Sequence, residues 1–134
     1  MKNALAPKGF IFKYQDMPSR DVVARQFADL MAALSHPQRL RIALELRAGE
    51  LDVKTLTERL GIAHSSTSQH LSLLRAHHLV VERREGRRVF YHLAQPALAT
   101  WLVSGLKLLE REARDTASLV EALDKARTAW SRGE

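Results

Sequence analysis

The sequence predicts a mainly α-helical fold with a small β-hairpin, arranged as a winged helix-turn-helix domain. Apolar residues recur at helical spacing over most of the chain. Two short helical segments are separated by a glycine-containing turn, and an alternating strand pattern with a charged turn comes directly after them. Aromatic residues make up only 6% of the chain, which favours a helical core of Leu, Ala and Val over a β-sandwich.

The amino-terminal segment differs from the rest of the chain. Residues 1–18 carry lysines and two prolines without a sustained period, so we expect a mobile or loosely docked basic tail. A first helix is predicted from Arg20 to Leu34. Its apolar stripe consists of Val23, Phe27, Leu30, Met31 and Leu34.

Two further helices have clear start and stop signals. Ser35 is expected to cap the second helix, with Pro37 in its first turn and Gln38 closing a capping box. Asp52 is expected to cap a third helix, which Gly61 ends after Leu60. The predicted inward-facing residues of the two helices are Leu40, Ile42, Ala43, Leu46, Leu56 and Leu60.

The next helix begins at His64 with a run of small hydroxyl residues, and Leu71, Leu74 and Leu79 supply its inner face. The period then changes from that of a helix to that of a strand. Residues 79–93 read as a β-hairpin of about 15 residues with a basic tip around Gly86. A hairpin directly after a helix-turn-helix is the wing of a winged helix.

The last helix is predicted from Pro96 to about Trp130, with an apolar stripe too long for one small domain to cover. A second subunit is the simplest cover. We therefore expect a winged helix-turn-helix DNA-binding domain over 19–96, a dimerisation helix over 97–130 and a short tail over 131–134. The predicted dimer-interface residues are Phe27, Met31, Leu98, Trp101, Leu102, Gly105 and Leu109.

The chain is basic, with 21 Lys and Arg against 15 Asp and Glu and a net charge of +6. Such a surplus favours a polyanionic partner such as DNA. The chain has no cysteine, which excludes disulfides, zinc-thiolate fingers and thiol switches. It lacks both a signal-peptide pattern and an apolar run of the roughly 20 residues that span a bilayer, so a cytoplasmic protein without membrane contact is expected.

Three stretches resemble the ArsR/SmtB family of metalloregulatory repressors. They are residues 33–42 (ALSHPQRLRI), 68–80 (SQHLSLLRAHHLV) and 84–93 (REGRRVFYHL). The resemblance covers roughly residues 20–110. It implies a homodimer that binds a palindromic operator in double-stranded DNA, with repression relieved by a ligand. The DNA-reading positions implied by the resemblance are His64, Ser65, Ser68 and Gln69.

Side-chain chemistry supports a DNA-binding interpretation of these segments. Short hydroxyl residues allow close approach of a helix to the major groove, and glutamine can bond bidentately to adenine. The arginines of the hairpin can contact phosphates or the minor groove. The plainer interpretations are that Ser65 and Ser66 only cap the helix and that the hairpin tip is a solvated turn. The predicted DNA contacts are His64, Ser65, Ser66, Thr67, Ser68, Gln69, Arg83, Arg84, Arg87 and Arg88.

The family's usual metal ligands are absent. Its thiolate positions correspond to Asp52 and Lys54, and lysine offers a metal no lone pair. The positions of its second common site read Gln95, Ala97, Leu108 and Arg111. We therefore expect no metal and no cofactor, which leaves a small-molecule effector, a protein partner or constitutive repression. A site of unusual His and carboxylate ligands is the alternative within this family.

Other classes of protein fit less well. An enzyme would need a convergent nucleophile, base or phosphate-binding loop, and the six glycines form no such motif. A winged helix used for protein assembly remains an alternative, although the basic wing and Gln69 argue against it. A MarR-like regulator is the nearest alternative among DNA-binding proteins, but its longer chain and helical arms fit less well.

Overall fold

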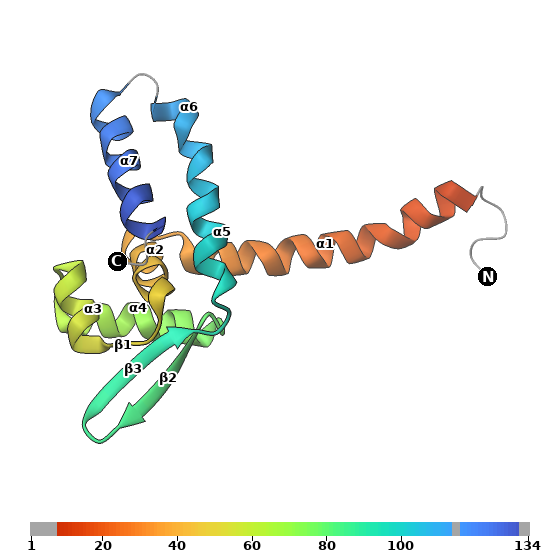
Figure 1. Cartoon of the computed structure of the whole chain (residues 1–134). Helices are drawn as coiled ribbons and strands as arrows, with labels where there is room; N and C mark the ends of the chain where they lie inside the picture. Colours follow the sequence, from red (N-terminus) through yellow and green to blue (C-terminus); the bar gives the residue numbers. More distant parts are fainter. Residues whose placement is uncertain (1–7, 114–115, 132–134) are drawn as a thin grey trace. The chain divides into compact units, whose positions relative to one another are not determined.

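The computed structural model describes residues 8–113 and 116–131, with side chains from residue 18 onward except that of residue 111. The chain divides into two compact units, residues 1–33 and 34–134. The described elements are mainly helices, with one three-stranded antiparallel sheet (Figure 1). This is the predicted winged helix-turn-helix. No described helix is long and apolar enough to cross a membrane.

The first unit is built on one long helix, α1 (Lys8–Leu34). It begins well before Arg20, so the described part of the segment expected as a tail is helical. Residues 1–7 lie outside the described part. Pro18 lies inside the helix, where it removes one backbone hydrogen bond and usually ends or kinks a helix. The sequence predicted a helix that starts after this proline. The observed helix instead continues through Pro18 and starts at Lys8.

Helix α2 (Pro37–Glu45) and the 3-10 turn η1 (Leu46–Ala48) form the centre of the second unit. The N-cap of α2 is His36 and not the expected Ser35, because His36 Nδ1 accepts the N–H of Gln38 at 3.1 Å. Pro37 occupies the first turn as predicted. The buried residues of this segment are Ile42, Ala43, Leu44 and Leu46.

Helices α3 (Val53–Leu60) and α4 (His64–Ala76) form the helix-turn-helix. Asp52 caps α3 as predicted, through a 3.0 Å bond from the Thr55 N–H to Oδ1. Gly61 ends α3 in the left-handed conformation, with φ of 67°, which a residue with a Cβ adopts only at a cost. Arg41 of α2 donates to the carbonyl of Arg59 at 2.8 Å, which ties this end of α3 to the core.

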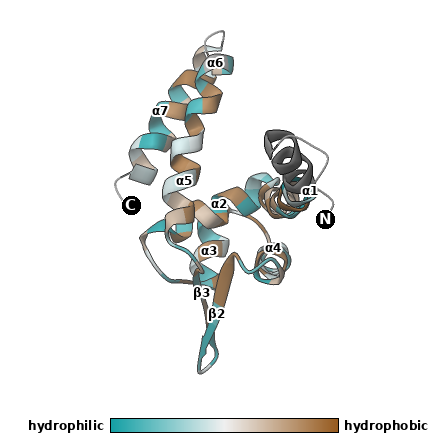
Figure 2. Cartoon of the chain, turned by 90° about the vertical axis from the view of Figure 1, so that its right-hand side faces the viewer, coloured by the Kyte–Doolittle hydropathy of each residue, from teal (hydrophilic) through white to brown (hydrophobic). Residues whose placement is uncertain are grey.

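The sheet has the strand order β1-β3-β2. Strands β2 (Val80–Glu85) and β3 (Arg88–Leu93) form the predicted hairpin, with Val80 opposite Leu93 and Glu85 opposite Arg88. The sequence did not predict β1 (Leu51–Asp52), which pairs with β3. The wing is hydrophobic at its base and hydrophilic toward its tip (Figure 2).

The carboxyl-terminal segment is not the single helix that was expected. It consists of α5 (Ala97–Gly105), the 3-10 turn η2 (Leu106–Leu109), α6 (Glu110–Ala113) and α7 (Ala117–Ser131). Helix α7 folds back beside α5 and α6 (Figures 1 and 2). Leu123 and Ala113 are buried here, so the apolar stripe that suggested one long helix is partly covered within the chain.

Candidate nucleic-acid interface

Helix α4 has a buried face and an accessible face. Leu71 and Leu74 are fully buried in the core, which fixes the orientation of the helix. The opposite face presents polar side chains of its first two turns. The exposed ones are His64, Ser65 and Gln69, and the half-buried ones are Ser66 and Ser68.

The amino terminus of α4 contradicts one of the plainer interpretations. Its N-cap is Ala63, and no side chain caps the helix. Ser65 and Ser66 therefore do not serve as caps, and their hydroxyls remain available at the surface. Thr67 differs from its neighbours: it is completely buried, and its hydroxyl donates to the Ala63 carbonyl at 3.4 Å. Because a buried side chain cannot reach a ligand at this surface, Thr67 leaves the expected contact set.

The wing turns over two residues, Gly86 and Arg87, between the paired Glu85 and Arg88. Gly86 has φ of 61°, and a positive φ at the first turn position alone is characteristic of a type II′ hairpin turn. The sequence places glycine where the turn needs it. The side chain of Arg87 is consequently presented at the tip of the wing.

Two wing arginines are held by carboxylates near β1. The Arg83 guanidinium bonds both carboxylate oxygens of Glu50, at distances down to 2.6 Å, and also Glu85 at 2.8 Å. These hydrogen bonds from Arg83 lower the pKa of Glu50. Arg88 donates to Oδ2 of Asp52 at 2.8 Å. Hydrogen bonds from Thr55, and then from Arg88, lower the pKa of Asp52 to about 2.

Phe90 lies between these two arginines. The guanidinium carbons of Arg83 and Arg88 are 4.5 and 4.8 Å from its ring centroid, a distance at which cations attract an aromatic ring. Both arginines are therefore held by a carboxylate near β1, Glu50 or Asp52, and by the Phe90 ring of β3. Their principal observed role is to attach the wing to the β1 segment.

A second polar cluster joins the wing to α4. Glu82 accepts hydrogen bonds from the Tyr91 hydroxyl at 2.8 Å, from Arg75 of α4 at 3.0 Å and from Arg84 at 3.1 Å. The Tyr91 hydroxyl bond is the largest cause of the lowered pKa of Glu82. Burial, and then Glu82, raises the pKa of Tyr91. The cluster fixes the wing beside α4.

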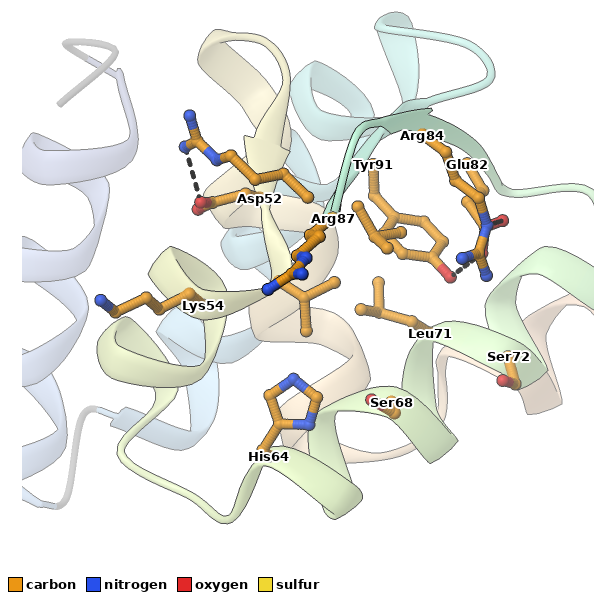
Figure 3. A pocket seen from close by; sticks show the side chains of 13 residues that line it. Asp52, Lys54, His64, Ser68, Leu71, Ser72, Glu82, Arg84, Arg87 and Tyr91 are labelled. Carbon is orange, nitrogen blue, oxygen red and sulfur yellow. Dashed lines mark hydrogen bonds and ion pairs between the residues drawn. The ribbon is translucent and has the colours of Figure 1, made fainter.

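A groove of about 710 Å³ lies between α3, α4 and the wing (Figure 3). It brings together five of the residues predicted to contact DNA, namely His64, Ser68, Arg84, Arg87 and Arg88. Ser65, Ser66, Gln69 and Arg83 do not line it. The groove also contains Lys54, which sequence reasoning treated only as the replacement of a metal ligand. Lys54 comes two residues after the capping Asp52, so the sequence already indicated that it lies in the first turn of α3.

The predicted dimer-interface residues of α5 and η2 are largely accessible within one chain. Trp101 is half exposed and Leu109 is exposed, while Leu98 and Leu102 are half-buried. A Cβ on Gly105 would meet no atom within 4 Å. Phe27 on α1 is half exposed, and Met31 is half-buried. These residues stay a prediction for the dimer interface.

Within the part of the chain that the structure describes, no group of three or more His, Cys, Asp or Glu side chains is arranged to hold a metal. At the first family position, Asp52 is already bonded to Thr55 and Arg88. Gln95, Ala97 and Leu108 offer no carboxylate or imidazole. The side chain of Arg111 lies outside the described residues.

Together, the helix-turn-helix, the wing and the basic groove define a winged helix-turn-helix protein. Comparison with known proteins identifies the family. The family model described as "Bacterial regulatory protein, arsR family" matches residues 36–81. The biofilm growth-associated repressor of Agrobacterium fabrum is 37% identical over 83 residues, which are 62% of this chain and 71% of that protein. The chain belongs to the arsR family of bacterial regulatory proteins.

Solved structures agree with this assignment. The transcriptional repressor BigR from Xylella fastidiosa is 36% identical, with a TM-score of 0.60 over 72% of this chain and 95% of that one. A homodimeric winged helix-turn-helix DNA-binding domain from Mycobacterium bovis is 29% identical, with a TM-score of 0.60 over 71% of this chain and 90% of that one. The likeness covers nearly all of each neighbour and leaves over a quarter of this chain unmatched.

Proposed function

We propose that this protein is a homodimeric transcriptional repressor that binds a palindromic operator. Helix α4 enters the major groove of each half-site, and the wing contacts the adjacent backbone. The observation that carries the proposal is the accessible polar face of α4, whose serines have no capping role in the helix. Side chains of this kind, together with Gln69, suit the reading of base edges.

Two observations support the homodimer. Apolar side chains of α5 and η2, including Trp101, Leu108 and Leu109, are exposed in the single chain, and burial of such a surface favours association. The related domain from Mycobacterium bovis is described as homodimeric. A second copy would also present a second α4, as a palindromic site requires.

The signal that relieves repression is proposed to be chemically different from a thiol or thiolate-bound metal. The chain has no cysteine, so neither disulfide formation nor soft-metal thiolate ligation is available to it. A small organic effector, bound at the subunit interface, fits the apolar character of α5. A thermal-shift screen with metal ions and metabolites tests this part of the proposal.

Selection of bound duplexes from a random pool tests the DNA-binding function. Enrichment of a palindrome whose half-sites are about one helical turn apart would support it. The control is the Gln69→Ala variant. The duplexes that it selects should show no base preference at one position of each half-site, the position that Gln69 reads. No enrichment by the wild-type protein at low salt would contradict the proposal.

A further inference from the structure

The groove contains two basic side chains that are not paired with a carboxylate. Lys54 lies on the first turn of α3 and is exposed. Arg87 lies at the wing turn and is also exposed. Neither forms an ion pair with any residue that the structure describes, although both line the same groove as His64.

The carboxylates that line this groove are engaged with other groups. Asp52 accepts from the Thr55 N–H and from Arg88. Glu82 accepts from Tyr91, Arg75 and Arg84. The negative charges are therefore already matched by partners, and the charges of Lys54 and Arg87 are left for a ligand from outside the chain.

The arrangement separates the groove into two ends. Figure 3 shows Lys54, His64 and Arg87 around one end, whereas Glu82, Arg84 and Tyr91 lie around the other. The first three come from α3, α4 and the wing respectively. Their ammonium, imidazole and guanidinium groups are hydrogen-bond donors carried by three different elements, and such groups suit the binding of backbone phosphates.

We propose that Lys54, together with Arg87 and His64, binds neighbouring phosphodiesters of the DNA backbone at this end of the groove. The inference rests on the proposed function and adds α3 to an interface assigned above to α4 and the wing. The ligand is a duplex and not a free phosphate, because the groove continues along α4 past Ser68 and Ser72. A polyanion lying against α4 would carry its backbone past each of the three basic groups.

Charge-removing variants measured against salt test the proposal. Lys54→Gln and Arg87→Gln are compared with the wild type on a mixed-sequence duplex, because phosphate contacts do not depend on sequence. The matched control is Lys125→Gln, which removes the same charge from an exposed side chain on α7. Each lost contact should make the slope of log Kobs against log[salt] shallower by about 0.9, or roughly twice that in a dimer.

The expected result is a shallower slope for Lys54→Gln and Arg87→Gln, an unchanged slope for Lys125→Gln, and recovery in Lys54→Arg. Lys54→Gln should unfold at the wild-type temperature, because the replaced side chain is exposed and has no ion-pair partner among the described residues. Lys54→Ala, which also removes the charge, provides the test if Lys54→Gln does not fold.

The outcomes separate this inference from the proposed function. A wild-type protein that fails to bind duplex at low salt contradicts both. A wild-type protein that binds, while Lys54→Gln behaves as Lys125→Gln does, overturns this inference and leaves the proposed function intact. Titration of inorganic phosphate into the DNA-free protein distinguishes the sources. Phosphate binding that depends on Lys54, with an unchanged DNA salt slope, would assign the site to free phosphate and also overturn the inference.

Discussion

Arg88 at the end of the wing turn donates to Oδ2 of Asp52 at 2.8 Å, while Oδ1 of the same carboxylate caps α3. The Asp52 side chain thus caps the first helix of the helix-turn-helix and also bonds an arginine of the wing. Since the two residues are 36 positions apart, the contact fixes the wing relative to α3. The wing's orientation is a property of the folded domain before any DNA is bound.

Asp52→Asn separates the two roles of Asp52. Asparagine is as good an N-cap as aspartate, so this variant should keep the cap and lose only the stability that the Asp52 charge contributes, together with the charge that holds Arg88. DNA affinity should fall because the wing is less well positioned. Asp52→Ala should lose the cap as well, at a cost of about 1 kcal/mol in the free energy of unfolding. Urea denaturation and DNA titration measure the two effects; equal stability of the two variants would contradict this division.

The pKa of Asp52 predicts a pH dependence of stability. Its folded-state pKa of about 2 lies below the ordinary value of 3.8. The carboxylate therefore contributes stability above about pH 4, and this contribution is lost as the pH falls from there toward 2. The free energy of unfolding of the wild type should fall more steeply over this window than that of Asp52→Asn. Parallel curves for the two proteins would show that Asp52 contributes nothing.

The four wing arginines should differ in their effects on DNA binding. Arg87 has no carboxylate partner among the described residues, so Arg87→Ala should weaken binding to all sequences and flatten its salt dependence. Arg83 pairs with Glu50 and Glu85, so Arg83→Ala should lower stability and affinity with a smaller change in salt slope. Fluorescence anisotropy over a salt series measures both; a larger slope change in Arg83→Ala would reverse the assignment.

Gln69 should contribute to sequence specificity. It is exposed on α4, and replacing a bidentate base contact costs about 1–3 kcal/mol at the base pair it reads. Gln69→Ala should therefore bind the selected operator more weakly and discriminate less at one position of each half-site. Binding to operators mutated one base pair at a time measures this. A uniform loss over all operators would indicate a phosphate contact instead.

Trp101 should contribute to self-association. It is half exposed in the single chain, and glutamate there would place a charge in an apolar interface. Trp101→Glu should shift the protein toward monomer and weaken operator binding. The control is Val81→Glu, which changes an exposed apolar residue of β2 that lies outside the predicted interface. Sedimentation equilibrium measures both; a Trp101→Glu dimer as stable as the wild type would place the interface elsewhere.

Periodicity and capping chemistry predicted most of the fold. The Asp52 cap, the left-handed Gly61 and the register around Gly86 all depend on local residue types, which sequence reveals directly. Strand β1 could not be predicted in this way, since its two residues are ordered by pairing with Tyr91 and Phe90 far along the chain. The start of α7 was missed because the apolar period continues past Thr116, whose carbonyl accepts the first hydrogen bonds of the new helix.

The candidate site was predicted less completely than the fold. The basic wing and the polar residues of α4 were evident from composition and from the family resemblance. Which arginines are held by carboxylates was not, because Glu50–Arg83 and Asp52–Arg88 join residues more than 30 positions apart. The burial of Thr67 depends on the rotation of α4, which its small residues alone do not specify.

Hydroxyl-radical footprinting of the protein on its selected duplex is the most direct test of operator recognition by a pair of α4 helices. We predict two protected segments on one face of the duplex, with centres about 10 base pairs, or one helical turn, apart. Gln69→Ala should give the same pattern only at higher protein concentration. Uniform protection without two defined segments, or no protection at protein concentrations that shift the duplex, would contradict recognition of an operator by a pair of α4 helices.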